Sequence, residues 1–105
     1  MSKTDFKVEM WDITKPKAYE SNPRQIGMES VAKTAMSIEK YGWRQPIVVD
    51  EDDIILAGHT RLLAGEYLKQ KQVPVHVAVG LTDEEKRAYR IADNRTAQES
   101  QWDLP

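Results

Sequence analysis

The amino-acid sequence predicts a single α+β domain (a mixed α/β arrangement) with a small mixed sheet and three main helices. The length of 105 residues suits one hydrophobic core. Short β-branched runs predict strands, and apolar residues at spacings of three and four predict helices between them. The predicted order is strand, loop, helix, strand, strand, helix, strand and helix, without internal repeats. We therefore expect one domain over residues 1–105.

The first part of the chain predicts one strand, one loop and one helix. Residues 6–13 (FKVEMWDI) alternate imperfectly between apolar and polar side chains, as in a strand with one buried face. Residues 14–25 contain two prolines, which is typical of a loop. Residues 29–41 are predicted to form an amphipathic helix that ends at Gly42. Its apolar face comprises Met28, Val31, Ala35 and Ile38.

Two β-branched runs, PIVVD and IILAG, are separated by the acidic residues EDD. This pattern predicts a hairpin or two neighbouring strands joined by a charged turn. The cluster of Asp50, Glu51, Asp52 and Asp53 could in principle hold a cation. We favour a solvated turn, because calcium loops also need a fixed ligand spacing and a glycine.

After Gly58 the pattern predicts a helix to about Lys71, with Leu63, Ala64, Tyr67 and Leu68 on its buried face. Residues 73–79 (VPVHVAV) predict a strand. His76 alternates with the valines beside it, so we expect a surface or strand-edge histidine rather than a ligand.

The last predicted helix has the clearest start signal. Thr82 and Glu85 form a capping-box pattern with acidic residues in the first turn. Its predicted apolar face comprises Leu81, Ala88, Ile91 and Ala92. In the final segment, ESQWDLP, no helix or strand is expected to end. Either the chain is a piece of a longer protein, with Trp102 packing back or facing a neighbour, or it has a short frayed terminus.

Composition limits the function classes. The formal net charge of −2 argues against a general basic DNA surface, so DNA contact is local, shared with another domain, or absent. The chain contains no cysteine, which excludes disulfides, thiolate nucleophiles and Cys-based zinc sites. The apolar runs are too short to span a membrane, and the start, MSKTDFKVEM, lacks a secretion signal. We therefore expect a soluble cytoplasmic protein without a membrane partner.

The predicted helix start at Gly58 could hold a phosphate group. A helix start leaves backbone N–H groups unpaired and carries about half a positive charge. Gly58 would let an anion approach the backbone, Thr60 adds a hydroxyl donor, and Arg61 adds a guanidinium that matches phosphate oxygens. The same residues also suit an ordinary polar turn.

Two further polar clusters could contribute. Arg24 lies in the proline-containing stretch NPRQ. Asp93 and Asn94 offer the hard oxygen ligands that Mg²⁺ prefers, and Arg87, Arg90 and Asn94 share one helix face. Alternatively, Asn94 simply caps the end of the last helix.

The succession NPRQ, SIEKYGWRQPIVVD, ILAGHTRLLAGEYL, VPVHVAV and YRIADNRTA resembles the ParB/sulfiredoxin superfamily over about residues 7–103. It is most similar to the ParB-like N-terminal domains (ParB-like nuclease domains) of phage and bacterial proteins, which often precede a DNA methyltransferase. The resemblance implies a ParB/sulfiredoxin-like fold. It also implies nucleotide binding and a link to DNA modification.

The resemblance transfers to this chain residue by residue. In ParB proteins the box that corresponds to Gly58–Arg61 reads Gly-Glu-Arg-Arg and holds the CTP triphosphate. In sulfiredoxins it reads Gly-Cys-His-Arg, and His59 occupies the cysteine position here, so sulfiredoxin chemistry is excluded. Only one of the two arginines of the ParB box is present here, which leaves CTP, ATP, ADP or another phosphate ligand open. The resemblance implies a nucleotide site comprising Arg24, Gln45, Gly58, His59, Thr60, Arg61, Asn94 and Arg95, with Mg²⁺ on Asp93 and Asn94.

His59 has three possible roles: a phosphate donor, a general base, or a neutral turn residue bonded to a backbone carbonyl. The leading hypothesis is a Mg²⁺-dependent CTP- or ATP-binding module of a DNA-associated protein, with DNA held by another domain or partner. The alternatives are an enzyme of this fold (a nucleotide hydrolase, kinase or nuclease with His59 or Asp93 as catalytic candidates) and a protein-interaction domain that has lost the ligand. We expect a monomer or weak dimer.

Overall fold

The computed structural model describes the backbone of residues 6–19 and 27–102, and the side chains of these residues up to Asp93. The elements run in the order β1 (Glu9–Asp12), α1 (Met28–Tyr41), β2 (Ile47–Val49), β3 (Ile55–Ala57), α2 (His59–Tyr67), β4 (Gln72–Val77) and α3 (Asp83–Trp102). The described elements confirm the predicted α+β class and its three main helices.

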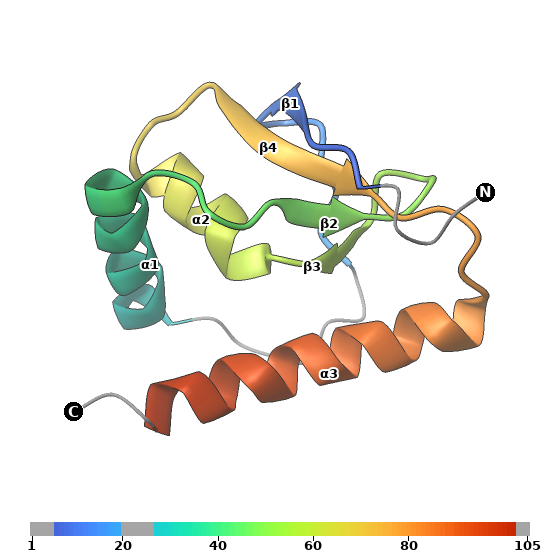
Figure 1. Ribbon diagram of the computed structural model, residues 1–105. Coiled ribbons are helices and arrows are strands. Elements are labelled where there is room, and N and C mark those ends of the chain that lie inside the picture. Colours follow the sequence, from blue (N-terminus) through green and yellow to red (C-terminus); the bar gives the residue numbers. More distant parts are fainter. Residues whose placement is uncertain (1–5, 20–26, 103–105) are drawn as a thin grey trace.

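One mixed four-stranded sheet forms the centre of the domain, in the order β1-β4-β2-β3. β1 pairs with β4 and β2 pairs with β3 in antiparallel fashion, whereas β2 and β4 are parallel. Helices α1 and α2 lie at one end of the sheet, and α3 runs beside the edge strand β3 (Figure 1). This arrangement confirms the predicted hairpin and puts the start of α2 directly after β3.

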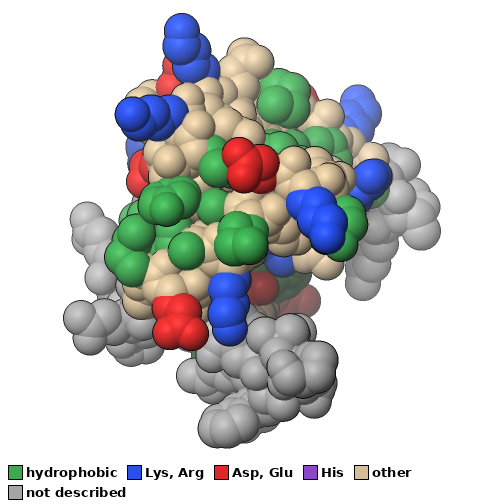
Figure 2. Space-filling model, turned by 90° about the vertical axis from the view of Figure 1, so that its left-hand side faces the viewer, with side chains coloured by type: hydrophobic (Ala, Val, Ile, Leu, Met, Phe, Trp, Pro, Cys, Tyr) green, Lys and Arg blue, Asp and Glu red, His purple; other side chains and the backbone are tan. Residues whose placement is uncertain are grey.

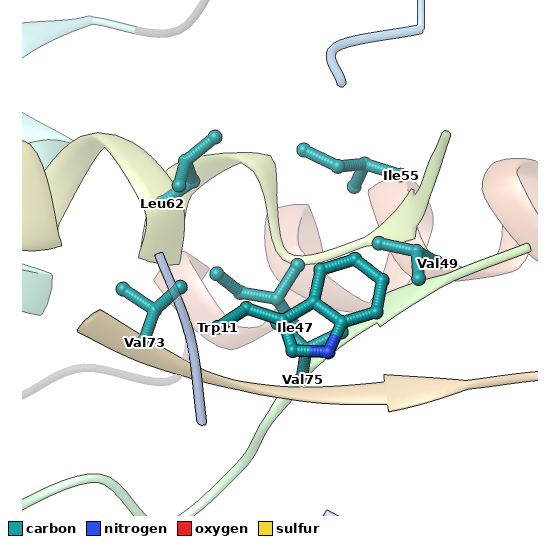
Figure 3. Close-up of a cluster of buried hydrophobic side chains, with 7 residues drawn as sticks. All are labelled: Trp11, Ile47, Val49, Ile55, Leu62, Val73 and Val75. Carbon is teal, nitrogen blue, oxygen red and sulfur yellow. The ribbon is translucent and has the colours of Figure 1, made fainter. Parts of the chain in front are cut away.

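The core lies between α2 and the sheet. Figure 3 shows its seven buried side chains, Trp11, Ile47, Val49, Ile55, Leu62, Val73 and Val75. A second cluster joins α1 to α2 through Val31, Ala35, Ile38 and Ala64. The predicted buried face of α1 is confirmed at three of its four positions, because Met28 is 64% exposed.

Local sequence signals set two helix boundaries correctly. Gly42, with φ of +77°, ends α1 and donates its N–H to the Ile38 carbonyl at 2.8 Å. At the start of α3, the Thr82 N–H donates to Glu85 Oε1 at 2.9 Å, and the Glu85 N–H donates to Thr82 Oγ1 at 3.1 Å. These reciprocal bonds are the predicted capping box.

The predicted face of α2 is confirmed at Ala64, which is buried, and at Leu68, which packs partly buried against the second cluster, but it is wrong at Leu63 and Tyr67. The buried residues of α2 are Leu62, Ala64 and Gly65, whereas Leu63 is 37% and Tyr67 55% exposed. Gly65 takes the core-facing position because a Cβ there would lie 3.2 Å from Val73 Cγ1 and 3.3 Å from Ile13 Cδ1. The helix also ends at Tyr67 rather than Lys71, because Lys69 adopts a left-handed conformation with φ of +60° before β4.

The predicted apolar face of α3 is also wrong. Ala88, Ile91 and Ala92 are exposed, with Ile91 at 65%. The half-buried side chains among those described in α3 are Lys86, Arg90 and Asp93, which share one face at spacings of four and three. We call these three residues the inner stripe of α3. Lys86 pairs with the Asp50 carboxylate, and Arg90 contacts the Ile55 carbonyl and the Tyr19 ring. These partners explain why charged side chains of α3 face the rest of the domain.

Helix α3 extends to Trp102, so the expectation that no helix ends in this segment is wrong. Asn94 therefore lies inside the helix and is not its C-terminal cap. The direction of the Trp102 side chain lies outside the described part of the structure. Among residues 6–19 and 27–102, no helix has the length and apolar content needed to cross a membrane.

Candidate functional site

Gly58 forms the turn between β3 and α2 in a conformation that favours glycine. Its φ is +103° and ψ is +22°, in the left-handed region. A Cβ atom at Gly58 would lie 3.2 Å from the Cα atom of Ile47 and 3.5 Å from Nη1 of Arg61. The conformation and the close approach of β2 therefore both favour glycine in this buried turn, which lies beside the Arg61 guanidinium.

The first residues of α2 follow this turn. The Leu62 N–H donates to the Gly58 carbonyl at 2.9 Å, which begins the helical hydrogen-bond pattern. The N–H groups that precede it have no acceptor within the helix, as at every α-helix start. His59, Thr60 and Arg61 are half-buried in this first turn. The partial positive charge of a helix start and the Arg61 side chain thus lie together.

Arg61 is held by a residue that is distant in sequence. Its Nη2 donates a hydrogen bond to Oε1 of Gln45, in the loop between α1 and β2. Since Gln45 and Arg61 were both predicted to belong to the nucleotide site, their contact joins two separate parts of it. The sequence alone could place Gln45 there only through the family resemblance.

His59 lies beside Tyr19, a residue that the sequence analysis missed. The Tyr19 backbone N–H donates to Nε2 of His59 at 3.3 Å. One alternative for His59 was a bond to a backbone carbonyl, whereas this contact pairs it with a backbone N–H donor. No local pattern marks Tyr19, because its contact with His59 spans 40 residues.

Arg90 connects this region to α3. Its guanidinium carbon lies 3.7 Å from the centroid of the Tyr19 ring, and its Nε donates to the Ile55 carbonyl at 3.1 Å. Arg87, which was predicted to share a face with Arg90, is exposed. Asp93 is half-buried one helical turn after Arg90.

Three predicted site residues cannot be located in full. Arg24 lies outside the described residues. Asn94 and Arg95 lie within α3, but their side chains are not described. Among the residues with described side chains, no group of three or more histidine, aspartate or glutamate residues could hold a metal ion.

The acidic cluster between β2 and β3 is a turn with exposed side chains at Glu51 and Asp52, as predicted, but Asp50 departs from the prediction because it is buried. Asp50 is only 3% exposed, and its Oδ1 accepts the N–H groups of Asp52 and Ile54 at 2.8 and 3.0 Å. Its Oδ2 lies 3.5 Å from Nζ of Lys86. Burial raises the pKa of Asp50, but the two N–H donors and Lys86 outweigh it and bring the pKa below its ordinary value.

His76 also differs in part from the prediction. It is half-buried on β4, which is an inner strand of the sheet and not an edge. Its Nδ1 donates to the Lys7 carbonyl at 2.9 Å, and its ring centroid lies 4.5 Å from that of Phe6. These contacts fasten the segment before β1 and account for this histidine structurally.

Comparison with known proteins identifies relatives of this chain. Residues 3–95 match the family described as the ParB N-terminal domain. A protein of Escherichia coli, described as ParB-like nuclease domain-containing protein YnaK, is 46% identical over 69 residues. These cover 66% of this chain and 79% of that protein.

Two solved structures share the fold. The C-terminally truncated chromosome-partitioning protein ParB from Caulobacter crescentus, complexed with CTP-gamma-S, superposes with a TM-score of 0.72 and 25% identity. The match covers 84% of this chain and 52% of the ParB chain, so this chain spans about half of that protein. Sulfiredoxin from Arabidopsis thaliana gives a TM-score of 0.65 at 22% identity, over 79% of this chain and 96% of that one.

Proposed function

Because this chain belongs to the ParB N-terminal domain family, within the ParB/sulfiredoxin superfamily, we propose that it binds the phosphates of a nucleotide at the start of α2. The observation that carries the proposal is the Gly58 turn. A left-handed glycine without room for a Cβ leads into the unpaired N–H groups of a helix start, with Arg61 alongside.

The chemistry of these groups suits a phosphate. The Arg61 guanidinium can donate two parallel hydrogen bonds to phosphate oxygens, and its contact with Gln45 limits its orientations. Thr60 and His59 in the same helical turn add side-chain donors. Arg24, Asn94 and Arg95 complete the proposed site through the family resemblance.

A nucleoside triphosphate, CTP or ATP, is the proposed ligand. The Caulobacter relative is complexed with CTP-gamma-S, which supports a nucleotide. The chain has Thr60 where the ParB box carries its first arginine, so ATP is proposed alongside CTP. Asp93 and Asn94 would hold Mg²⁺ beside the phosphates, since carboxylate and amide oxygens are suitable ligands. The half-buried position of Asp93 on the inner stripe agrees with this role.

We further propose that the domain is a cytoplasmic module of a DNA-associated protein and that another domain or partner holds the DNA. Figure 2 shows basic and acidic side chains interspersed over the face of α1 and α2, without a continuous basic area among the coloured residues. With a net charge of −2, this surface does not suit general binding of a polyphosphate backbone.

Calorimetric titration with CTP, ATP, ADP and GTP, with and without Mg²⁺, tests nucleotide binding. We expect at least one triphosphate to bind and Arg61→Ala to weaken its affinity at least tenfold. Arg87→Ala, which removes an exposed arginine of α3, is the matched control and should bind as the wild type does. Absence of binding, or unchanged affinity in Arg61→Ala, would contradict the proposal and favour a protein-interaction domain.

The name of the Escherichia coli relative favours a nuclease as the second candidate. A nuclease of this fold would cleave single- or double-stranded DNA in the presence of Mg²⁺ or Mn²⁺. Incubation with labelled DNA, with Asp93→Asn as the inactive control, tests this candidate. Release of inorganic phosphate from the bound nucleotide, lost in His59→Ala, would instead indicate a hydrolase.

A further inference from the structure

The Nε2 atom of His59 has a defined hydrogen-bonding role. Its Nε2 accepts the backbone N–H of Tyr19 at 3.3 Å. A neutral imidazole carries its proton on one nitrogen and accepts with the other. Because an N–H group can only donate, Nε2 must be the unprotonated nitrogen and Nδ1 the protonated one.

The donor in this contact is itself held from two sides. On one side, the Ile55 N–H donates to the Lys17 carbonyl at 2.8 Å, which fixes the segment before Tyr19 along β3. On the other side, the Arg90 guanidinium covers the Tyr19 ring at 3.7 Å. Arg90 is held in turn by its hydrogen bond to the Ile55 carbonyl. The Lys17 and Arg90 contacts therefore both involve the backbone of Ile55, which is fully buried.

We infer that Tyr19 and Arg90 are positioning residues that hold His59 in the Nδ1-protonated tautomer, so that His59 does not act as a general base. A general base must offer a lone pair. In this tautomer the Nε2 lone pair is engaged by Tyr19, and Nδ1 carries the proton.

The arrangement also explains why an arginine lies on the inner stripe at this position. Only a long side chain with a planar cation can cover the Tyr19 ring and donate to the Ile55 carbonyl at once. A lysine at position 90 would keep the charge but lose the planar contact. The tyrosine ring contributes its face, so phenylalanine at position 19 should serve equally well.

Nitrogen NMR of the histidine side chains in the nucleotide-free protein tests this inference directly. At about pH 8, above the ordinary imidazole pKa of about 6.5, long-range proton–nitrogen spectra distinguish protonated from unprotonated ring nitrogens. We expect wild-type His59 to show a single tautomer with the proton on Nδ1. A His76→Gln variant assigns the signals, because the chain contains only two histidines.

The variants separate positioning from general stability. Arg90→Gln and Tyr19→Leu should each turn the single tautomer into a mixture, whereas Arg87→Gln and Tyr19→Phe should match the wild type. A backbone amide spectrum establishes that each variant is folded, and either variant alone suffices if the other fails to fold.

A wild-type proton on Nε2, or a single Nδ1 tautomer that persists in a folded Arg90→Gln or Tyr19→Leu variant, would overturn the corresponding role. The measurement uses no nucleotide. Failure of the nucleotide titration would therefore leave this result intact, and the two proposals can fail separately.

Discussion

Asp50 and Lys86 form an ion pair between the β2–β3 turn and the first turns of α3, with 3.5 Å between Oδ2 and Nζ. Glu51 adds a second carboxylate 3.5 Å from the same ammonium group and accepts the Gly80 N–H at 3.0 Å. Both partners of the main pair are largely shielded, with side-chain exposures of 4% and 15%. This cluster fastens the beginning of α3 to the sheet.

Replacement of Asp50 by alanine should destabilise the fold. The substitution leaves the N–H groups of Asp52 and Ile54 without their acceptor, at a cost of about 1–3 kcal/mol for each that stays buried. Urea unfolding measures the change in free energy. Asp52→Ala, at an exposed carboxylate of the same turn, should change stability by no more than about 0.5 kcal/mol. Equal effects of the two substitutions would contradict the structural role of Asp50.

Stability should fall in acid because of the same cluster. Burial raises the pKa of Asp50, but the N–H groups of Ile54 and Asp52 and the charge of Lys86 lower it by more, so the pKa lies below its ordinary value. A group with a depressed folded-state pKa stabilises the fold above its unfolded-state pKa, and this stabilisation is lost as pH falls through the folded-state value. The free energy of unfolding should therefore drop below about pH 4.

Urea titrations between pH 2.5 and 7 would measure this loss, with pH steps of about half a unit around the ordinary carboxyl pKa. Asp50→Asn, which cannot ionise, should give a flatter pH profile than the wild type. The profiles would be parallel if Asp50 had the same pKa in the folded and unfolded states. Glu51, whose pKa the Gly80 N–H lowers, and Asp12, whose pKa the Thr14 hydroxyl and N–H lower, contribute to the remaining slope.

Gly58→Ala should impair both folding and the proposed binding. The left-handed conformation costs a non-glycine residue about 1–2 kcal/mol, and the new Cβ would press on the Ile47 backbone at 3.2 Å. Thermal unfolding and nucleotide titration measure the two effects. Gly27→Ala is the control, since Gly27 has φ of −82° and no atom within 4 Å of a new Cβ. A Gly58→Ala protein as stable as Gly27→Ala would show that the turn relaxes freely.

Gln45→Ala should weaken nucleotide affinity without a comparable loss of stability. The exposed Gln45 side chain accepts a hydrogen bond from Arg61. Its removal therefore takes away a contact that orients the guanidinium but leaves no cavity in the hydrophobic core. We expect a severalfold lower affinity, smaller than the loss in Arg61→Ala, in the same titration. Arg44→Ala, next in sequence and also exposed, separates this effect from general changes in the loop. Unchanged affinity in Gln45→Ala would mean that Arg61 needs no support.

Features with a local cause could be predicted from the sequence. Gly42, the Thr82–Glu85 capping box and the β2–β3 hairpin each depend on residues within a few positions of one another. The inner stripe of α3 could not be predicted, because the partners of Lys86 and Arg90 are Asp50 and Ile55, some 35 residues away. Part of the buried face of α2 was missed for a similar reason: Gly65 is selected by side chains of other elements.

The candidate site divides in the same way. Gly58 and Arg61 lie three residues apart, and helix-start chemistry predicts them without further information. Gln45 required the family resemblance, and its contact with Arg61 is visible only in three dimensions. Tyr19 carries no signal in its own neighbourhood, because its importance comes from a backbone N–H group that any residue except proline would supply.

The charged inner stripe of α3 also has a thermodynamic consequence. Separation of α3 from the sheet would break the ion pairs of Lys86 with Asp50 and Glu51 and the hydrogen bond from Arg90 to the Ile55 carbonyl. Added salt would favour this separation by screening Lys86 from its two carboxylates. The attachment of this helix to the domain should therefore weaken as ionic strength rises.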